Sequence, residues 1–384
     1  MKICHVITRM IVGGAQENTL LSVRGALEKG HDVTLVTGPS PGPEGELLRT
    51  VSCPGIKVVT CPDLVREIAP WKDFRAYQFL KRYFRDEKFD VVHTHSSKAG
   101  IVGRFAADSA RIPLIVHTIH GLAFHRFEKK WKNALYIACE KAAAKHCTRI
   151  YAVAQAMIDQ SLAEHIGSPE MYKVVYSGME LELFLNAKPE QALREKLGIP
   201  EGKTVFATLA RLFPLKGYED FFPIAMQLAK ENPNVHFLII GDGILTEKYK
   251  RELADLALEN RFSFAGLVPP NQVHRYLALA DALTHFSLRE GLPRAAVQSL
   301  ATGKPVIAYR LDGTPEVVQN GRTGYLLEPG DLDGIRNAMR EIVENPDMAK
   351  RLGESGRNLV SGLFGWRKMS DTLLEDYAKC LGKS

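Results

Sequence analysis

The sequence predicts an α/β protein built from two doubly wound, Rossmann-like domains with parallel sheets. Three observations lead to this fold class. The 384 residues are the length of two average domains. Short apolar segments alternate with longer segments of helical periodicity along most of the chain. A stretch rich in glycine, proline and charge, residues 177–202, interrupts this alternation near the middle.

The first half of the chain begins with a strand, a helix and a second strand. Residues 3–8 and 31–37 are the expected strands, and residues 15–29 are the helix between them. Further strands are expected at 91–93, 114–118 and 150–153. Most of these segments are almost continuously apolar, which is typical of parallel strands buried on both faces.

The same rhythm restarts after residue 203. Strands are expected at 205–209, 235–240, 262–264, 282–285 and 305–309. A last helix is expected near the C-terminus, where apolar residues recur at helical spacing from Trp366 to Tyr377. We therefore expect one domain over 1–187, a second over 188–363, and a final helix over 364–384.

Composition excludes several classes of protein. Hydrophobic residues make up 45% of the chain and charged residues 24%, so a disordered or fibrous protein is excluded. The six cysteines form no C-x-x-C pair, so neither a zinc site nor a disulfide framework is indicated, and reduced thiols in a cytoplasm fit better. No signal peptide and no run of ~20 apolar residues is present, so a cytoplasmic location is expected, with peripheral contact with the inner face of the cell membrane left open.

The net charge of +6 is concentrated in the first half. Residues 1–187 carry 24 basic and 19 acidic side chains. This excess suits an anionic partner, although solubility alone explains a mild excess equally well. No nucleic-acid-binding motif accompanies it, so no nucleic acid is expected.

Candidate functional residues of the first domain follow its strands. Gly13 and Gly14 precede the first helix, where backbone N–H groups favour an anion, although a tight strand-to-helix turn explains them as well. His93 and His95 share one face of a strand, which allows a metal site. No carboxylate accompanies them, so no metal site is expected. His120 ends the next strand, where it is placed to reach a ligand or to be a buried, hydrogen-bonded histidine.

The second domain presents two further loops. Arg211 and Lys216 follow its first strand, and a guanidinium with an ammonium suits a diphosphate. Glu290 precedes a helix expected to start at about Leu292, with Gln298 two turns further along the same face. A carboxylate and an amide on one face suit the hydroxyls of a sugar or ribose, although Glu290 is also a plausible N-cap acid.

Taken in order, these loops resemble the retaining glycosyltransferases of family 4, which have the two-domain GT-B fold. The resemblance covers nearly the whole chain. It is carried by Gly13-Gly14, His120-Gly121, Arg211 with Lys216-Gly217, Gly241-Asp242-Gly243, Phe264 to Val268, Glu290-Gly291-Leu292-Pro293, Gly303-Lys304-Pro305-Val306 and Gly313 to Val318. It implies two domains that face each other across a cleft, the first for the acceptor and the second for the donor, and a C-terminal helix that crosses back to the first domain.

The resemblance also implies roles for individual residues. Arg211 and Lys216 hold the donor diphosphate, and Glu290 accepts a hydrogen bond from the donor sugar. The N–H groups of Gly291 and Leu292 assist there. His120 lies near the anomeric carbon. Gly14 gives the diphosphate room, Leu267 and Val268 border the base, and Gln298 takes the place of the acid that usually binds the ribose.

The loss of charge at Gln298 predicts modestly weaker donor binding, on the order of 1 kcal/mol, without loss of activity. No metal and no cofactor are expected, because Arg211 and Lys216 neutralise the leaving diphosphate and the nucleotide sugar is a substrate. The expected enzyme is a metal-independent, retaining transferase that moves a hexose or N-acetylhexosamine from a nucleoside diphosphate sugar, preferably a UDP-sugar.

The acceptor is expected to be a lipid-linked glycan. Residues 93–100 resemble a stretch of family members that extend glycans on polyprenyl diphosphate. Residues 81–85 and 125–132 mix cations with aromatic side chains, which suits an anionic membrane or a plain solvated helix face. Two alternatives stay open: a UDP-sugar 2-epimerase of the same fold, and a catalytically silent subunit that binds a sugar nucleotide.

Overall fold

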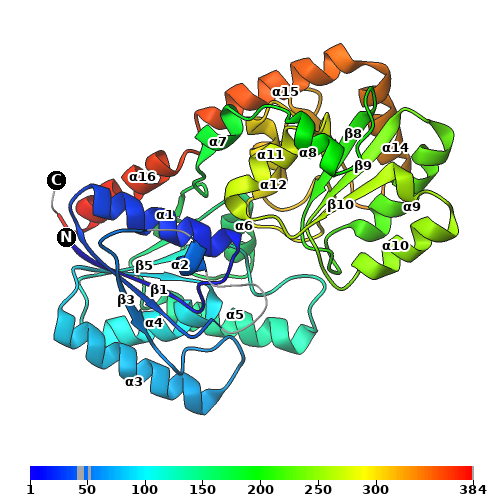
Figure 1. Ribbon diagram of the computed structural model, residues 1–384. Helices are drawn as coiled ribbons and strands as arrows, with labels where there is room; N and C mark the ends of the chain where they lie inside the picture. The colour runs from blue at the N-terminus through cyan, green and yellow to red at the C-terminus, as the bar shows by residue number, and fades with distance from the viewer. Residues whose placement is uncertain (41–46, 51–52, 383–384) are drawn as a thin grey trace. The chain divides into compact units, whose positions relative to one another are not determined.

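The computed structural model describes residues 1–40, 47–50 and 53–382, and the chain divides into two compact units (Figure 1). The first unit comprises Met1–Met179 and Trp366–Ser384, and the second comprises Glu180–Gly365. The division falls before helix α7 (Leu181–Leu185) and not after residue 187, as the sequence suggested, because α7 packs against helix α12 (Arg294–Ala301) of the second unit.

The first unit contains a sheet of parallel strands in the order β3-β2-β1-β4-β5-β6-β7. Its strands are β1 (Lys2–Ile7), β2 (Asp32–Thr37), β3 (Lys57–Thr60), β4 (Val91–His95), β5 (Leu114–Ile119), β6 (Arg149–Ala152) and β7 (Tyr172–Val174). The five expected strands are confirmed. The edge strands β3 and β7 were not expected, because both are short and polar at several positions.

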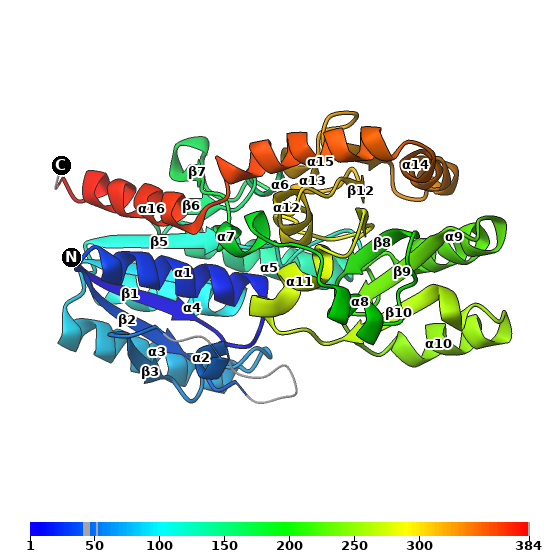
Figure 2. The ribbon, with the colours of Figure 1, turned by 45° about the horizontal axis from the view of Figure 1, so that its top comes forward.

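Helices cover both faces of this sheet (Figure 2). They are α1 (Gly14–Glu28), α2 (Leu47–Thr50), α3 (Pro70–Glu87), α4 (Ser97–Ser109), α5 (Lys130–Ala144), α6 (Gln155–Ala163) and α16 (Trp366–Cys380), with a 3₁₀ turn at Pro169–Met171. Helices α3 and α4 cover one face. There, Leu80 and Phe84 of α3 belong to the same buried cluster as Val92 of β4. On the other face, α1 and α16 lie side by side. The C-terminal helix thus belongs to the first unit.

The second unit repeats this plan with the strand order β10-β9-β8-β11-β12-β13. Its strands are β8 (Thr204–Leu209), β9 (Val235–Ile240), β10 (Phe262–Gly266), β11 (Ala282–His285), β12 (Val306–Tyr309) and β13 (Gly324–Leu327). Its remaining helices are α8 (Gln191–Lys196), α9 (Tyr218–Glu231), α10 (Thr246–Asp255), α11 (Val273–Leu277), α13 (Thr314–Val317), α14 (Leu332–Glu344) and α15 (Pro346–Ser361), with 3₁₀ turns at Glu259–Arg261 and Pro270–Gln272. All the strands expected here are confirmed.

Apolar side chains of α9, α10 and α14 form the main core of the second unit against its sheet. Phe222 of α9 stacks on Tyr249 of α10, with ring centroids 3.8 Å apart. Helices α12 and α15 pack together, with α12 on β11 and α15 on β13. Among the described residues, no helix combines the length and the apolar character needed to cross a bilayer.

Both sheets share a feature that positions ligands. The first strand of each lies inside the sheet, β1 between β2 and β4, and β8 between β9 and β11. Successive strands are therefore added on opposite sides of the first one. Open parallel sheets bind ligands at such a point, beyond the carboxyl ends of the strands. The loops after β1 and β4, and those after β8 and β11, are thus the first places to look for a site, with the loop after β5 next to them.

Candidate functional site

The loop after β8 carries Arg211 and Lys216 and has a constrained backbone. Leu215 and Gly217 both have left-handed conformations, with φ of 68° and 76°. A Cβ atom at Gly217 would lie 2.0 Å from the carbonyl oxygen of Phe286, so only glycine fits there. Arg211 is exposed, with its guanidinium 5.2 Å from the ring centroid of Phe213. The loop therefore holds Lys216 in one place at the start of α9.

The Gly241-Asp242-Gly243 segment supports that loop from behind. Added Cβ atoms at Gly241 and Gly243 would lie 2.1 Å and 2.3 Å from the carbonyl oxygens of Ala210 and Leu212. The N–H of Leu212 donates to the Asp242 carbonyl at 3.1 Å. These glycines are therefore needed for close backbone packing beneath the loop that carries Arg211.

Lys216 and Glu290 form the centre of the site in the second unit. The Lys216 Nζ atom lies 2.7 Å from Glu290 Oε1 and 3.3 Å from Ser287 Oγ. The Glu290 side chain is 19% exposed. Its burial acts to raise its pKa, but the charge of Lys216, the adjacent His285 and hydrogen bonds from Lys216 and Ser287 outweigh this effect, so the pKa of Glu290 is lowered. Glu290 is consequently a charged hydrogen-bond acceptor at neutral pH.

Glu290 is also fixed through its backbone, because its N–H donates to the carboxylate of Asp312 at 2.8 Å. The sequence predicted that helix α12 starts at about Leu292, but it begins at Arg294. The reason is that Pro293 follows Leu292, and the residue before a proline avoids the helical conformation. Gly291 and Leu292 are buried ahead of this helix, and the Gly291 carbonyl accepts from the N–H of Gly313 at 3.2 Å. Gln298 lies within α12 and is partly buried.

Leu267 and Val268 follow β10, at the edge of the same sheet. Leu267 is 68% exposed and Val268 is partly buried. Strand β9 separates β10 from β8, so these residues lie on the same carboxyl edge as Arg211 but not on a neighbouring strand. An exposed leucine at this edge is available for contact with a flat apolar group.

In the first unit, His120 follows β5 and is held by a chain of histidines. His120 Nε2 lies 3.0 Å from His95 Nδ1, and His95 Nε2 lies 3.0 Å from His5 Nδ1. The expectation that His93 and His95 share a face is confirmed, because their ring centroids are 4.1 Å apart. His93 contacts Thr118 Oγ1 through Nε2 at 2.6 Å.

Burial keeps the rings of His5, His93 and His95 uncharged. It lowers the pKa of His5 to about 3 and holds the pKa values of His93 and His95 well below their usual range. Nitrogens of His5, His93 and His95 lie within 4.8 Å of one another, a separation that would also allow a metal ion to bind. The expectation of no metal stays a prediction.

Gly14, the other expected residue of the first unit, is the first residue of α1. The preceding Gly13 has a φ of 176°, an extended conformation that any residue adopts. The next residue, Ala15, lines a cavity of about 260 Å³ together with His120. The expected site residues are thus divided between the units, with Gly14 and His120 in the first and all the others in the second.

Several residues around these sites were not expected from the sequence. Asp312 and His285 contact Glu290, and His5 ends the histidine chain. His285 and Asp312 lie at or just after strand ends, which was the available signal. His5 is inside a strand and nothing in the local sequence marks it.

Comparisons with known proteins identify the family of this chain. The model for a glycosyl transferase 4-like domain matches residues 13–178, and the model for glycosyl transferases group 1 matches residues 189–359. A protein of Escherichia coli, the UDP-Gal:alpha-D-GlcNAc-diphosphoundecaprenol alpha-1,3-galactosyltransferase, is 30% identical over 381 residues, which are 98% of this chain and 96% of that protein. This chain belongs to the group 1 glycosyltransferases.

Other relatives of this glycosyltransferase extend the comparison. A D-inositol 3-phosphate glycosyltransferase of Corynebacterium glutamicum is 25% identical, and the matched region spans 89% of this chain and 86% of that protein. The crystal structure of Anabaena Alr3699/HepE in complex with UDP and glucose superposes with a TM-score of 0.83 at 20% identity, covering 99% of this chain and 100% of that chain. The glycosyltransferase therefore has the GT-B fold, with two Rossmann-like domains.

Proposed function

We propose that this glycosyltransferase moves a hexose or N-acetylhexosamine from a UDP-sugar to a hydroxyl of a lipid-linked glycan, with the α configuration retained. The Lys216–Glu290 pair at the carboxyl ends of β8 and β11 is the observation that carries the proposal. It combines a cation for a diphosphate with an ionised acceptor for a sugar hydroxyl in one half-buried place.

The donor would be held by the second unit. An ammonium group has three N–H donors, so Lys216 can bind a phosphate oxygen while it remains bonded to Glu290. Arg211, on the same loop, would help Lys216 to neutralise the negative charge of the leaving diphosphate. The N–H groups of Gly291 and Leu292 would assist, Gln298 would bind the ribose, and Leu267 with Val268 would border the base.

The first unit would hold the acceptor, with His120 beside the anomeric carbon and Gly14 leaving room for the diphosphate. Retention would follow if the acceptor attacks on the face from which the diphosphate leaves, with a phosphate oxygen taking the acceptor proton. No protein base and no metal ion are then required. The Escherichia coli relative is named for a diphosphoundecaprenol-linked acceptor, which supports a lipid-linked acceptor here.

The first experiment measures transfer from UDP-sugars to a synthetic N-acetylglucosaminyl diphosphate lipid. Lys216→Ala and Glu290→Gln should each lower kcat by about tenfold or more, as loss of one preorganised charge does. Lys248→Ala, which removes an exposed lysine of α10, is the matched control and should leave kcat unchanged. Added EDTA should have no effect.

Three outcomes would contradict the proposal in whole or in part. Full activity of both site variants would remove the assigned roles of Lys216 and Glu290. Formation of an epimer from the UDP-sugar alone, without transfer, would identify a 2-epimerase instead. A β-linked product would overturn retention while leaving the transferase assignment intact.

We further propose that the first unit docks on the inner face of an anionic membrane, with the enzyme in the cytoplasm. Residues 81–85 fit this less well than the sequence suggested, because Phe84 belongs to the core. Exposed aromatic side chains instead include Trp71 and Phe74 near the start of α3, and Phe127 and Trp131 near the start of α5. Both helix starts lie at the carboxyl edge of the sheet, since each helix follows a parallel strand.

Flotation with vesicles tests this docking. The protein should bind vesicles that contain phosphatidylglycerol, binding should fall as salt rises, and neutral phosphatidylcholine vesicles should bind weakly. Trp71→Ser with Trp131→Ser should reduce binding, whereas the exposed Leu256→Ser in the second unit should not. Equal flotation of all variants would refute docking through this surface.

A further inference from the structure

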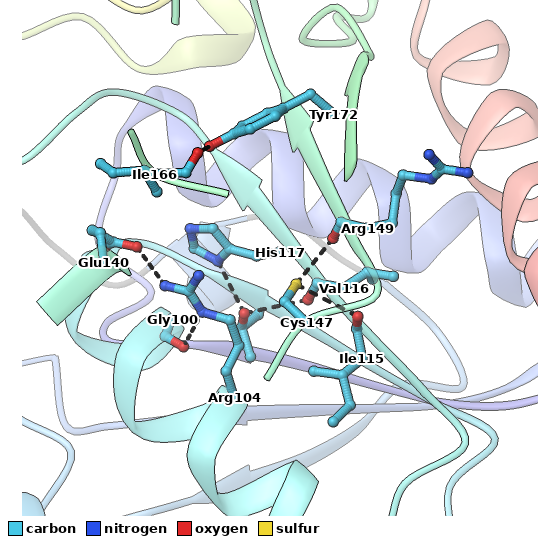
Figure 3. A network of polar contacts seen from close by, with 11 residues as sticks. Gly100, Arg104, Ile115, Val116, His117, Glu140, Cys147, Arg149, Ile166 and Tyr172 are labelled. Atoms are coloured by element: carbon cyan, nitrogen blue, oxygen red, sulfur yellow. Dashed lines mark hydrogen bonds and ion pairs between the residues drawn. The ribbon is translucent and has the colours of Figure 1, made fainter. Parts of the chain in front are cut away.

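A cavity in the first unit contains a buried charge that the proposed chemistry does not use. The cavity has a volume of about 260 Å³, and its lining includes residues of β5, β6 and β7 together with residues of α4 and α5. Arg104, Glu140, His117 and Tyr172 line it together with His120. Figure 3 shows the Arg104 guanidinium between the Glu140 carboxylate and the His117 ring.

Arg104 is fully buried and only partly satisfied. Its Nε atom donates to the Gly100 carbonyl at 2.8 Å, and its Nη2 atom donates to Glu140 Oε2 at 2.5 Å. Its Nη1 atom is buried and has no hydrogen-bond partner among the described residues. Buried donors are almost always satisfied by protein, water or a ligand, so these two N–H bonds call for a partner within the cavity.

The surroundings hold the guanidinium in this position. A Cβ atom at Gly100 would lie 2.5 Å from His117 Cε1, so glycine lets the His117 ring pack against α4. His117 Nδ1 is bonded to Thr94 Oγ1 at 2.9 Å. Burial and the adjacent Arg104 lower the pKa of His117 well below its usual range, so that ring is uncharged. Arg104 and Glu140 therefore balance each other, and the residues that line the cavity have no net charge.

We propose that this cavity binds one uncharged sugar ring of the acceptor, with Arg104 Nη1 donating to one ring hydroxyl and the Glu140 carboxylate accepting from a neighbouring one. A phosphate would leave the paired Glu140 next to an anion, whereas vicinal hydroxyls offer both an acceptor and a donor. The apolar walls, which include Leu122, Phe124 and Ile166, suit the C–H faces of a sugar ring.

The size of the cavity limits what it can hold. Pockets for drug-sized ligands have volumes of ~300–1,000 Å³, so 260 Å³ accommodates one ring with its substituents and excludes an oligosaccharide or a lipid chain. That the sugar belongs to the acceptor rests on the proposed function, because His120 lines the same cavity and is assigned there to the reacting carbon. Binding of a neutral sugar as such does not depend on it.

The alternative is a purely structural ion pair that ties α4 to α5, with water on Nη1. Two variants separate these possibilities. Glu140→Gln keeps the size of the side chain and removes its charge. Ala123→Leu fills part of the cavity from a partly exposed position and leaves the Arg104 contacts intact. Asp73→Asn is the control, because Asp73 pairs with Lys98 of α4 outside the cavity lining.

The experiment measures binding and kinetics separately. Saturation-transfer NMR without donor tests the methyl α-glycosides of N-acetylglucosamine, glucose, galactose and mannose, with inorganic pyrophosphate as the anionic probe. Steady-state assays with the N-acetylglucosaminyl diphosphate lipid give KM for acceptor and donor. We expect a methyl glycoside to bind the wild type and Asp73→Asn. In Ala123→Leu and Glu140→Gln its binding should be lost and the acceptor KM raised about tenfold or more, with the donor KM unchanged.

Two results would overturn the inference. Pyrophosphate binding that is lost in Ala123→Leu, without sugar binding to the wild type, would make the cavity an anion site. An unchanged acceptor KM in Ala123→Leu would show that the Arg104–Glu140 pair is structural, even if Glu140→Gln fails to fold. An enzyme that binds a methyl glycoside but transfers no sugar would refute the proposed function and retain the sugar-binding cavity, so the two failures are distinguishable.

Discussion

Single residues determine the protonation of the site in the first unit. His5, His95 and His120 form a hydrogen-bonded chain, and burial keeps His5 and His95 neutral, so each of these two rings carries one N–H and one lone pair. His5 Nε2 is buried and has no partner among the described residues. A buried N–H without a hydrogen-bond partner is rarer than a buried acceptor without one. We therefore expect the lone pair on His5 Nε2 and the N–H on His5 Nδ1.

This assignment makes a prediction for His120. If His5 Nδ1 donates to His95, then His95 Nδ1 donates to His120 Nε2, and the proton of His120 lies on Nδ1. Long-range ¹H–¹⁵N correlation spectra of histidine-labelled protein at neutral pH should show this tautomer. His5→Phe should leave both tautomers of His120 populated. A proton on His120 Nε2 in the wild type would contradict the chain.

At the scale of elements, each loop of the candidate site depends on the element beneath it. The loop after β8 stays in place because Gly241 and Gly243 allow backbone contact below it and Gly217 allows contact with the segment after β11. The hydrogen bond from the Leu288 N–H to the Leu215 carbonyl, at 2.9 Å, joins these two segments directly. Lys216 and Glu290 are thus positioned by backbone packing, which resists small changes in side chains nearby.

Gly217 and Gly303 distinguish the energetic cost of a left-handed backbone conformation from the cost of a close contact with a neighbouring segment. Gly217 and Gly303 both have left-handed φ values, 76° and 75°, but a Cβ atom would meet the backbone of Phe286 only at Gly217. We expect Gly303→Ala to lower the free energy of unfolding by about 1–2 kcal/mol, the cost of the left-handed conformation alone. Gly217→Ala should cost more, because the loop must also move.

Urea unfolding and donor titration check this pair. Gly217→Ala should raise the Kd for UDP-sugar, since Lys216 moves with the loop, whereas Gly303→Ala should leave that Kd unchanged. Equal destabilisation of both variants, with equal donor affinity, would mean that the contact at Phe286 does not position the loop.

At the scale of the whole molecule, the C-terminal helix completes the first unit. Trp366, Met369, Leu373 and Tyr377 of α16 are buried in the core that includes β1 and β4. Asp376 is also buried, and it accepts from the Tyr151 hydroxyl at 2.8 Å and pairs with Lys173 at 2.8 Å. The first unit therefore depends on residues that follow the second unit in the chain.

Leu373→Ala tests this dependence. It should lower the stability of the first unit by about 2–5 kcal/mol, as other large-to-small core substitutions do. Amide hydrogen exchange should then rise in β1 and β4 but not in β8 and β9. The exposed Glu375→Ala, in the same helix, is the control. A uniform rise across both units would show that the two do not unfold separately.

The sequence by itself determined the fold class, ten of the strands but not β3, β7 or β13, and the loops that carry Arg211, Lys216 and Glu290. These follow from local patterns, because buried parallel strands are continuously apolar and ligands lie beyond their carboxyl ends. Only the tertiary structure decided which side chains meet. Arg104 lies inside a helix and His5 inside a strand, so nothing local marks either one. Their partners, Glu140 and His95, are brought to them by strand order and helix packing, which no short stretch of sequence contains.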